Sequence, residues 1–162
     1  MRLTERKIGN DCLVGDGAHA KIQRQASGVL YLTCKNFKNG NLDISKVDYI
    51  SEEDYSKYFR AESKALTKPQ IGDVLFSIIG TIGEPYLYQQ KDRFGISSSV
   101  SLLRPDVNVV NPNYLYYWIK GDIFQNALYG VKGGVAQGYV SLEMIKSITS
   151  LLSSTCNPTT HS

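Results

Sequence analysis

The chain has 162 residues, of which 42% are hydrophobic, so it is long enough for one sizeable core but short for two ordinary domains. Its 18 basic and 15 acidic side chains give a formal charge of +3, an excess too small to indicate or exclude a nucleic-acid partner. No stretch approaches the roughly 20 apolar residues of a membrane-spanning helix. The three cysteines, Cys12, Cys34 and Cys156, lack the close spacing of a zinc site or a disulfide framework. We therefore expect a soluble, cytoplasmic protein with reduced thiols and no membrane partner.

The first half of the chain predicts a strand, a tight turn and one short helix. Residues 28–33 are a run of strand formers, and the Asn39-Gly40 pair behind them is typical of a hairpin turn. Ser51 precedes three acidic residues, and aromatic residues follow at helical spacing. This combination of a capping side chain and first-turn acids predicts a helix over about residues 52–60.

Two further strands are predicted in the middle of the chain. Residues 74–79 form an apolar run between glycines that is too short for a helix. Residues 96–103 form a second strand candidate, which ends before an Arg-Pro pair. Both runs have the length of a buried strand.

Helices dominate the predictions beyond residue 110. Asn111 and Pro112 provide a capping side chain and a first-turn proline, which predicts a helix that ends near Gly121. A shorter helix follows over about residues 122–128. Four glycines within residues 130–138 then predict a loop.

The order of these elements predicts an α+β fold, a twisted sheet with short helices that lie mostly in the C-terminal half. The sequence shows no internal repeat, so we expect one domain over residues 1–152. Residues 153–162 are small and polar without periodicity, and we expect a disordered tail there.

Three short motifs match nucleotide-handling loops in letters, but the residues around them favour simpler explanations. Residues 15–20 match a dinucleotide-binding fingerprint, yet residues 21–27 lack the apolar stripe of the helix that such a site needs, so a glycine turn is favoured. Residues 133–138 have the glycine spacing of a phosphate loop, but a tyrosine and a valine stand where its lysine and hydroxyl are required. Residues 111–114 are similar to the Asn-Pro-Pro-Tyr loop of amino-methyltransferases. In this sequence, however, helix capping explains each of these residues better.

Catalytic and metal-binding groups do not cluster in the sequence. His19 has no cysteine or acidic partner at metal-ligand spacing, and no Gly-x-Ser-x-Gly elbow supplies a nucleophile. The acidic residues at 52–54 are explained as helix-start charges. We therefore expect no catalytic residue, no metal and no cofactor.

Basic and amide side chains gather in segments that glycines flank. Arginine and lysine can neutralise phosphates or read guanine, while asparagine and glutamine can pair with adenine. Solvated loops carry the same residue types, so composition alone makes these residues candidates and no more. The candidates are Lys21, Gln23, Arg24, Gln25, Lys35, Asn36, Lys38, Lys132, Gln137 and Tyr139.

Six segments of the chain form an ordered set that is more specific than any one of them. They are residues 15–19, 28–32, 35–40, 72–83, 113–117 and 133–140. Taken together over about residues 7–152, they resemble the target recognition domain of type I restriction-modification specificity subunits. The strongest single match is Gly-Asp-Val-Leu-Phe-Ser-Ile-Ile-Gly-Thr-Ile-Gly at residues 72–83.

The resemblance implies a non-catalytic module that binds one half of a bipartite site in double-stranded DNA. In that family such domains position methyltransferase subunits, while separate motor subunits translocate and cut DNA. Glycine loops would let the backbone approach the duplex, and polar side chains on them would read base edges in the major groove. For phosphates we expect Lys21, Arg24, Lys35, Lys38 and Lys132. For bases we expect Gln23, Gln25, Gln137 and Tyr139.

The sequence departs from the family in extent, because complete specificity subunits carry two such domains separated and followed by long helices. Here we expect one such domain, and the family pattern stops near Leu152. We therefore expect a truncated, frameshifted or deliberately shortened product. One alternative is a half-subunit that binds methyltransferase partners and inhibits, without productive DNA recognition. Another is a nucleic-acid methyltransferase fragment that uses residues 111–114, which binding of a methyl donor would indicate.

Overall fold

The computed structural model describes residues 6–80, 84–132 and 140–150, except for the side chains of residues 131 and 132. Its strands are β1 (Arg6–Lys7), β2 (Cys12–Asp16), β3 (Val29–Leu32), β4 (Phe37–Lys38), β5 (Asn41–Leu42), β6 (Asp48–Ile50), β7 (Val74–Ser77), β8 (Pro85–Leu87), β9 (Phe94–Ile96), β10 (Val100–Pro105) and β11 (Thr149–Ser150). Its helices are α1 (Ile8–Asp11), α2 (Glu52–Tyr58), α3 (Pro112–Lys120), α4 (Asp122–Lys132) and α5 (Leu142–Lys146), with a 3₁₀ turn η1 (Cys34–Asn36). Within this described part, no helix has the length and apolar character needed to cross a membrane.

The central feature is an antiparallel four-stranded sheet in the order β2-β10-β7-β8, and it is covered on both faces. In β7, Val74 and Phe76 contact one hydrophobic core, whereas Leu75 contacts the other. In β10, Leu103 contacts the first of these cores and Leu102 contacts the second. Because alternate side chains of a strand point to opposite faces, a strand covered twice favours apolar residues on both faces. This explains why the run that predicted β7 is apolar at every position except Ser77.

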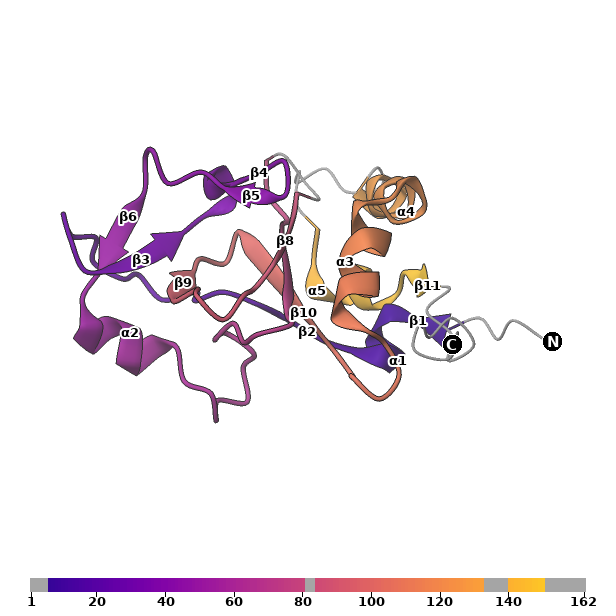
Figure 1. Ribbon diagram of the computed structural model, residues 1–162, viewed down its shortest axis with the longest axis horizontal. Coiled ribbons are helices and arrows are strands. Elements are labelled where there is room, and N and C mark those ends of the chain that lie inside the picture. Colours follow the sequence, from indigo (N-terminus) through magenta and orange to yellow (C-terminus); the bar gives the residue numbers. More distant parts are fainter. Residues whose placement is uncertain (1–5, 81–83, 133–139, 151–162) are drawn as a thin grey trace.

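Helices α3, α4 and α5 cover one face of this sheet (Figure 1). The predicted start of α3 is confirmed, because Asn111 Oδ1 accepts hydrogen bonds from the backbone N–H groups of Asn113 at 2.9 Å and Tyr114 at 3.4 Å. Pro112 occupies the first turn. Helix capping therefore accounts for residues that are similar to a methyltransferase loop in letters.

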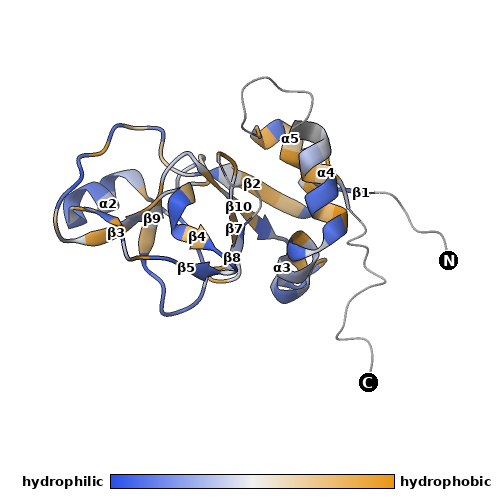
Figure 2. Ribbon diagram, turned by 90° about the horizontal axis from the view of Figure 1, so that it is seen from above, coloured by the Kyte–Doolittle hydropathy of each residue, from blue (hydrophilic) through white to orange (hydrophobic). Residues whose placement is uncertain are grey.

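A three-stranded sheet in the order β6-β3-β9 and helix α2 form the other end of the molecule (Figure 1). The predicted cap of α2 is confirmed, since Ser51 Oγ accepts from the backbone N–H of Asp54 at 3.0 Å. The rings of Tyr55 and Phe59 stack with centroids 5.6 Å apart and face the second core. Figure 2 shows that hydrophobic residues follow the central strands, while α2 is largely hydrophilic.

The first and last described strands lie next to each other at the helical end of the molecule (Figure 1). β1 pairs antiparallel with β11, with Lys7 opposite Thr149. The backbone N–H of Ile8 donates to the carbonyl of Ile148 at 2.9 Å. Long-range pairing of this kind has no local sequence signal, and the sequence analysis did not anticipate it.

The α+β class with short, mostly C-terminal helices is confirmed, but the strands divide into several sheets and two boundaries were wrong. The strand expected over residues 96–103 is two strands, because β9 ends at Ile96 in one sheet and β10 begins at Val100 in another. A turn joins them, in which the N–H of Val100 donates to the carbonyl of Ser97 at 3.1 Å. The helix expected to end near residue 128 continues through Gly130. The predicted tail at 153–162 lies outside the described residues.

The glycine turn expected over residues 15–20 was also wrong, because these glycines are needed for close packing. Gly15 is a paired residue of β2, opposite Leu102. A Cβ on Gly15 would lie 2.3 Å from the carbonyl oxygen of Leu66, and one on Gly17 would lie 2.1 Å from that of Ile96. Only glycine lets the backbone approach so closely.

We predict that Gly17→Ala lowers the free energy of unfolding by about 1–3 kcal/mol, because the added methyl group must displace backbone. Gly130→Ala is the matched control, since nothing lies within 4 Å of a Cβ there. That second change should raise stability by about 0.5–1 kcal/mol through helix propensity. Urea unfolding measures both, and equal effects of the two changes would contradict the packing role of Gly17.

A buried ion pair fastens the start of β7 to the end of β10. Arg104 Nε and Nη2 donate to the two carboxylate oxygens of Asp73 at 2.9 and 2.8 Å, and Nη2 also donates to the carbonyl of Lys68 at 3.0 Å. Asp73 is 1% exposed. Burial raises the pKa of Asp73, although hydrogen bonds from Arg104 and from the backbone of Gln70 oppose the rise. The carboxylate therefore depends on its partner to stay charged.

We predict that Arg104→Met lowers the free energy of unfolding by about 3 kcal/mol at pH 7, because it leaves a buried carboxylate unpaired. The folded-state pKa of Asp73 then rises further, so the loss should shrink as the pH falls toward its ordinary value of about 4. Adding Asp73→Asn to the same variant should restore part of the stability, since a neutral amide is less costly to bury. A loss that is equal at pH 4 and pH 7 would rule out this explanation.

Candidate nucleic-acid interface

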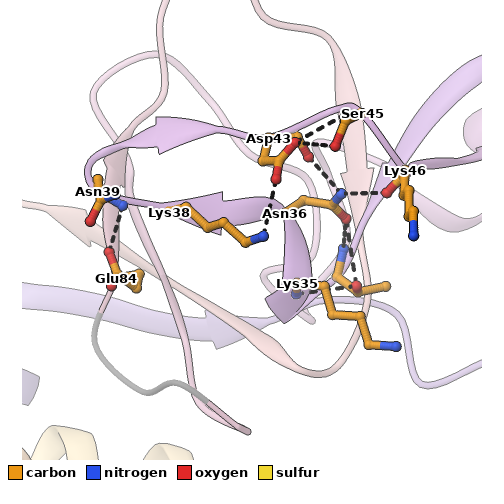
Figure 3. Close-up of polar contacts among 9 residues, drawn as sticks. Lys35, Asn36, Lys38, Asn39, Asp43, Ser45, Lys46 and Glu84 are labelled. Carbon is orange, nitrogen blue, oxygen red and sulfur yellow. Dashed lines mark hydrogen bonds and ion pairs between the residues drawn. The ribbon is translucent and has the colours of Figure 1, made fainter.

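The loop between β3 and β6 is organised around the side chain of Asn36 (Figure 3). Asn36 Oδ1 accepts from the backbone N–H of Thr33 at 2.9 Å, and Nδ2 donates to the carbonyls of Asp43 at 2.9 Å and Lys46 at 3.1 Å. Asn36 is 3% exposed. Its amide therefore holds the two ends of the loop together from inside.

Asp43 fixes the outer part of the same loop (Figure 3). Its Oδ1 accepts from the hydroxyl and the backbone N–H of Ser45 at 2.6 and 3.1 Å, and its Oδ2 accepts from Lys38 Nζ at 3.0 Å. These bonds lower the pKa of Asp43 to about 2. The bonds from Ser45 have the largest effect, and the bond from Lys38 has a smaller one. Lys38 is thus paired with a carboxylate that stays ionised at any physiological pH.

The predicted Asn-Gly turn joins β4 to β5 and reaches across to β8. Asn39 and Gly40 have φ of 53° and 76°, the left-handed conformations that a two-residue hairpin turn requires. The backbone N–H of Asn39 donates to Glu84 Oε2 at 2.8 Å (Figure 3). A Cβ on Gly40 would lie 2.6 Å from the hydroxyl of Tyr116 in α3. The hairpin is therefore held against the central sheet and its helical layer.

A hollow of about 490 Å³ opens between this loop and the residues that flank positions 81–83. Its lining is Cys34, Lys35, Phe37, Lys38, Asp43, Ser45, Lys46, Gly80 and Glu84. Lys35 and Lys46 are exposed and have no hydrogen-bond or ion-pair partner for their ammonium groups within the described residues. The hollow thus presents two uncommitted positive charges on a rigid loop.

Val140 lies beside the segment that leads from β7 to the hollow. Its backbone N–H donates to the carbonyl of Ile78 at 3.1 Å, and Ile78 stands two residues before Gly80, which lines the hollow. Of the loop predicted over residues 130–138, the first three residues belong to α4 and the others lie outside the described residues. Gln137 and Tyr139 lie outside the described residues, and only the backbone of Lys132 is described, as the last residue of α4.

The candidates at residues 21–25 lie apart from this hollow, along the outer edge of β6. The backbone N–H of Gln25 donates to the carbonyl of Tyr49 at 2.8 Å. Arg24 is anchored, because Nη1 donates to the carbonyl of Ile22 at 2.6 Å and the guanidinium lies 4.1 Å from the centroid of the Tyr31 ring. It also pairs with Asp48 at 3.3 Å. A separate hollow of about 650 Å³ is lined by residues 20–24.

Lys21, Gln23 and Gln25 are the exposed members of that second group without a side-chain partner among the described residues. His19 nearby pairs with Asp16, with Nε2 2.7 Å from Oδ2. In the described parts of the chain no group of three or more histidine, cysteine, aspartate or glutamate side chains could hold a metal ion.

Lys46 and Glu84 are among the residues of the hollow that sequence reasoning missed. Lys46 could have been found, because it lies in the same polar connection as Lys35 and Lys38. Glu84 could not, because it meets the β4–β5 hairpin only through a hydrogen bond to Asn39, which lies 45 residues earlier in the sequence. Conversely, Asn36 was singled out by its residue type, and the fold uses its amide internally.

We predict that Ser45→Ala raises the pKa of Asp43 from about 2 toward its ordinary value of 3.8, because the Ser45 hydroxyl is the largest cause of the depression. A carboxyl-carbon NMR titration of the chain measures this shift. Ser56→Ala, at an exposed position of α2, serves as a control that should leave Asp43 unchanged. An Asp43 pKa that stays near 2 in the Ser45 variant would contradict the hydrogen-bond geometry.

The sequence model of a known family matches most of this chain. The family is described as "Type I restriction modification DNA specificity domain", and the match covers residues 24–149. The chain is also 28% identical over 144 residues to a type I restriction enzyme MjaX specificity subunit of Methanocaldococcus jannaschii, a match that covers 84% of this chain and 32% of the relative. The EcoBI specificity subunit of Escherichia coli is 22% identical over 120 residues, covering 74% of this chain and 24% of the relative.

Solved structures show the same fold. The S subunit of a type I restriction-modification system from M. genitalium superposes with a TM-score of 0.59 at 13% identity, covering 94% of this chain and 35% of that one. The HsdS subunit from Thermoanaerobacter tengcongensis gives a TM-score of 0.53 at 14% identity, covering 90% and 32%. This chain thus spans about a third or less of the length of its relatives. It belongs to the family of type I restriction modification DNA specificity domains.

Proposed function

We propose that this chain binds double-stranded DNA through the hollow beside the β3–β6 loop and reads one half of a bipartite target site. It contributes sequence specificity and no catalysis of its own. Its relatives are specificity subunits of type I restriction enzymes, and the family is described as a DNA specificity domain. We further propose that the protein acts in the cytoplasm.

The observation that carries the proposal is the uncommitted charge of Lys35 and Lys46 at one rigid hollow. Lys38 and Arg24, the neighbouring cations in the two candidate segments, are already paired with Asp43 and Asp48. Lysine side chains that project from a fixed backbone can neutralise phosphates without a large ordering cost. The small net charge of +3 is therefore compatible with DNA binding, because the cations that matter are the unpaired ones.

The remaining candidates take different roles in this proposal. Lys21 and Gln23 offer a second, separate contact area at the outer edge of β6. We assign Asn36 to the loop scaffold and not to base reading, because both ends of its amide are already bonded. Arg24 and Lys38 would have to exchange an existing partner for a phosphate. Gln25, Lys132, Gln137 and Tyr139 remain predictions from the sequence.

We also propose that the domain acts with other subunits. Since the chain spans about a third of the specificity subunits that it matches, the complete recognition of a two-part site would need a second domain. The methyltransferase subunit and, through the complex, the restriction or motor subunit are the proposed protein partners.

We predict that the purified chain enriches one short motif from a randomised duplex library and that its affinity falls as salt rises. Replacing both Lys35 and Lys46 with methionine should lower affinity for all sequences alike. It should also reduce the slope of log affinity against log salt concentration by about two, because two phosphate contacts are lost. Lys64→Gln, at an exposed position of the α2–β7 connection, is the matched control and should change neither.

The outcomes separate the competing functions. Loss of affinity with an unchanged motif in the double variant supports phosphate contacts at the hollow. An unchanged salt dependence would place DNA binding elsewhere. If the chain binds a methyltransferase subunit tightly but enriches no motif, alone or in that complex, the inhibitory half-subunit would be favoured instead.

A further inference from the structure

Glu84 is a carboxylate in a hollow whose lining also contains three lysines. The other acidic residue of the lining, Asp43, is committed, because both of its oxygens accept bonds from Ser45 and Lys38. Glu84 forms no ion pair with a described residue, although Lys35 and Lys46 line the same hollow without partners. A negative charge here opposes phosphate binding, so its presence needs a different explanation.

The position of Glu84 is fixed by the backbone of the hairpin. Its Oε2 accepts from the N–H of Asn39 at 2.8 Å (Figure 3), at the turn where Asn39 and Gly40 take left-handed conformations. Residue 85 then begins β8, which pairs with β7 in the central sheet. One oxygen of the carboxylate is therefore anchored. The other, Oε1, has no hydrogen-bond partner in the part of the chain that the structure describes.

An anchored carboxylate with one free oxygen can only accept a hydrogen bond. Among base edges in the major groove, cytosine presents the N4 amino donor without an acceptor beside it on the same base. Adenine places the N7 acceptor next to its N6 donor, guanine presents two acceptors, and thymine presents an acceptor and a methyl group. A carboxylate is repelled by each of these acceptors, so cytosine is the base that suits it.

We propose that Glu84 reads a cytosine by accepting a hydrogen bond from its N4 amino group, while Lys35 and Lys46 hold the flanking phosphates. This inference rests on the proposed DNA binding and adds a residue that determines specificity at one base pair. The charges then have separate tasks: the lysines supply affinity for any sequence, and Glu84 discriminates by being unfavourable wherever no donor faces it.

Glu84→Gln is the sharpest test, because glutamine keeps an oxygen for the N–H of Asn39 and so preserves the anchor. With that oxygen anchored, the amide NH2 takes the place of the free carboxylate oxygen and can only donate, so it suits a base that presents acceptors, such as guanine. In selection from a randomised duplex library, we expect the wild-type chain to require cytosine at one position. The variant should lose that requirement by about tenfold at that position alone and shift toward guanine.

Glu53→Gln is the matched charge control, because it makes the same chemical change at an exposed residue of α2 that does not line the hollow. It should leave the preferred base unchanged. A complementary measurement leaves the protein intact and replaces the selected cytosine by N4-methylcytosine, whose methyl group blocks the major-groove donor. We expect about a tenfold loss of affinity, and no loss with 5-methylcytosine, which keeps the donor.

The failures of the two proposals differ. If the wild-type chain enriches a motif and both the Glu84 variant and the N4-methylcytosine duplex leave the preference unchanged, the role of Glu84 is overturned while DNA reading stands. If the wild-type chain enriches no motif and shows no salt-dependent binding, the proposed function fails, and the role of Glu84 fails with it.

Discussion

Burial of the central sheet on both faces is the constraint on which the other features depend. Leu75 and Leu102 face one core, while Val74, Phe76 and Leu103 face the other, so neither layer can shift without disturbing the same two strands. The Arg104–Asp73 pair closes one end of those strands. At the opposite end, β7 leaves the sheet toward Gly80, and the hollow forms there. The candidate interface is thus an edge of the most tightly held part of the fold.

Local structure was predictable where all the residues that determine a cap or a turn lie in one short segment. Ser51 and Asn111 are caps that satisfy the N–H groups of the turn that follows, and Asn39-Gly40 adopts the only kind of turn that suits a two-residue hairpin. Periodicity failed where neighbours in space decide the outcome. Residues 96–103 look like one strand, but a turn at Ser97 sends its two halves into different sheets. Gly15 looks like a turn residue, but the approach of Leu66 requires it.

The candidate site was predictable only as a set of polar loops. Lys35, Asn36 and Lys38 stand almost next to each other in the sequence, and the structure gives them three different states: unpaired and exposed, buried and fully bonded, and exposed but paired with Asp43. Residue type cannot separate these states, because the partners of Asn36 and Lys38 lie up to ten residues away. Glu84 shows the same limit over a longer range, since a hairpin 45 residues earlier supplies its anchor.

Pairing of β1 with β11 brings the two ends of the described chain to a single point, on the side of the helices and away from β6 (Figure 1). A unit that is entered and left at one point can be carried within a longer polypeptide without a break in its own sheets. It can also be exchanged for another unit of the same design, because only the short pair of strands must match the surrounding chain. For proteins that read DNA, such a junction lets a new sequence preference be acquired whole, while the rest of the assembly keeps its geometry.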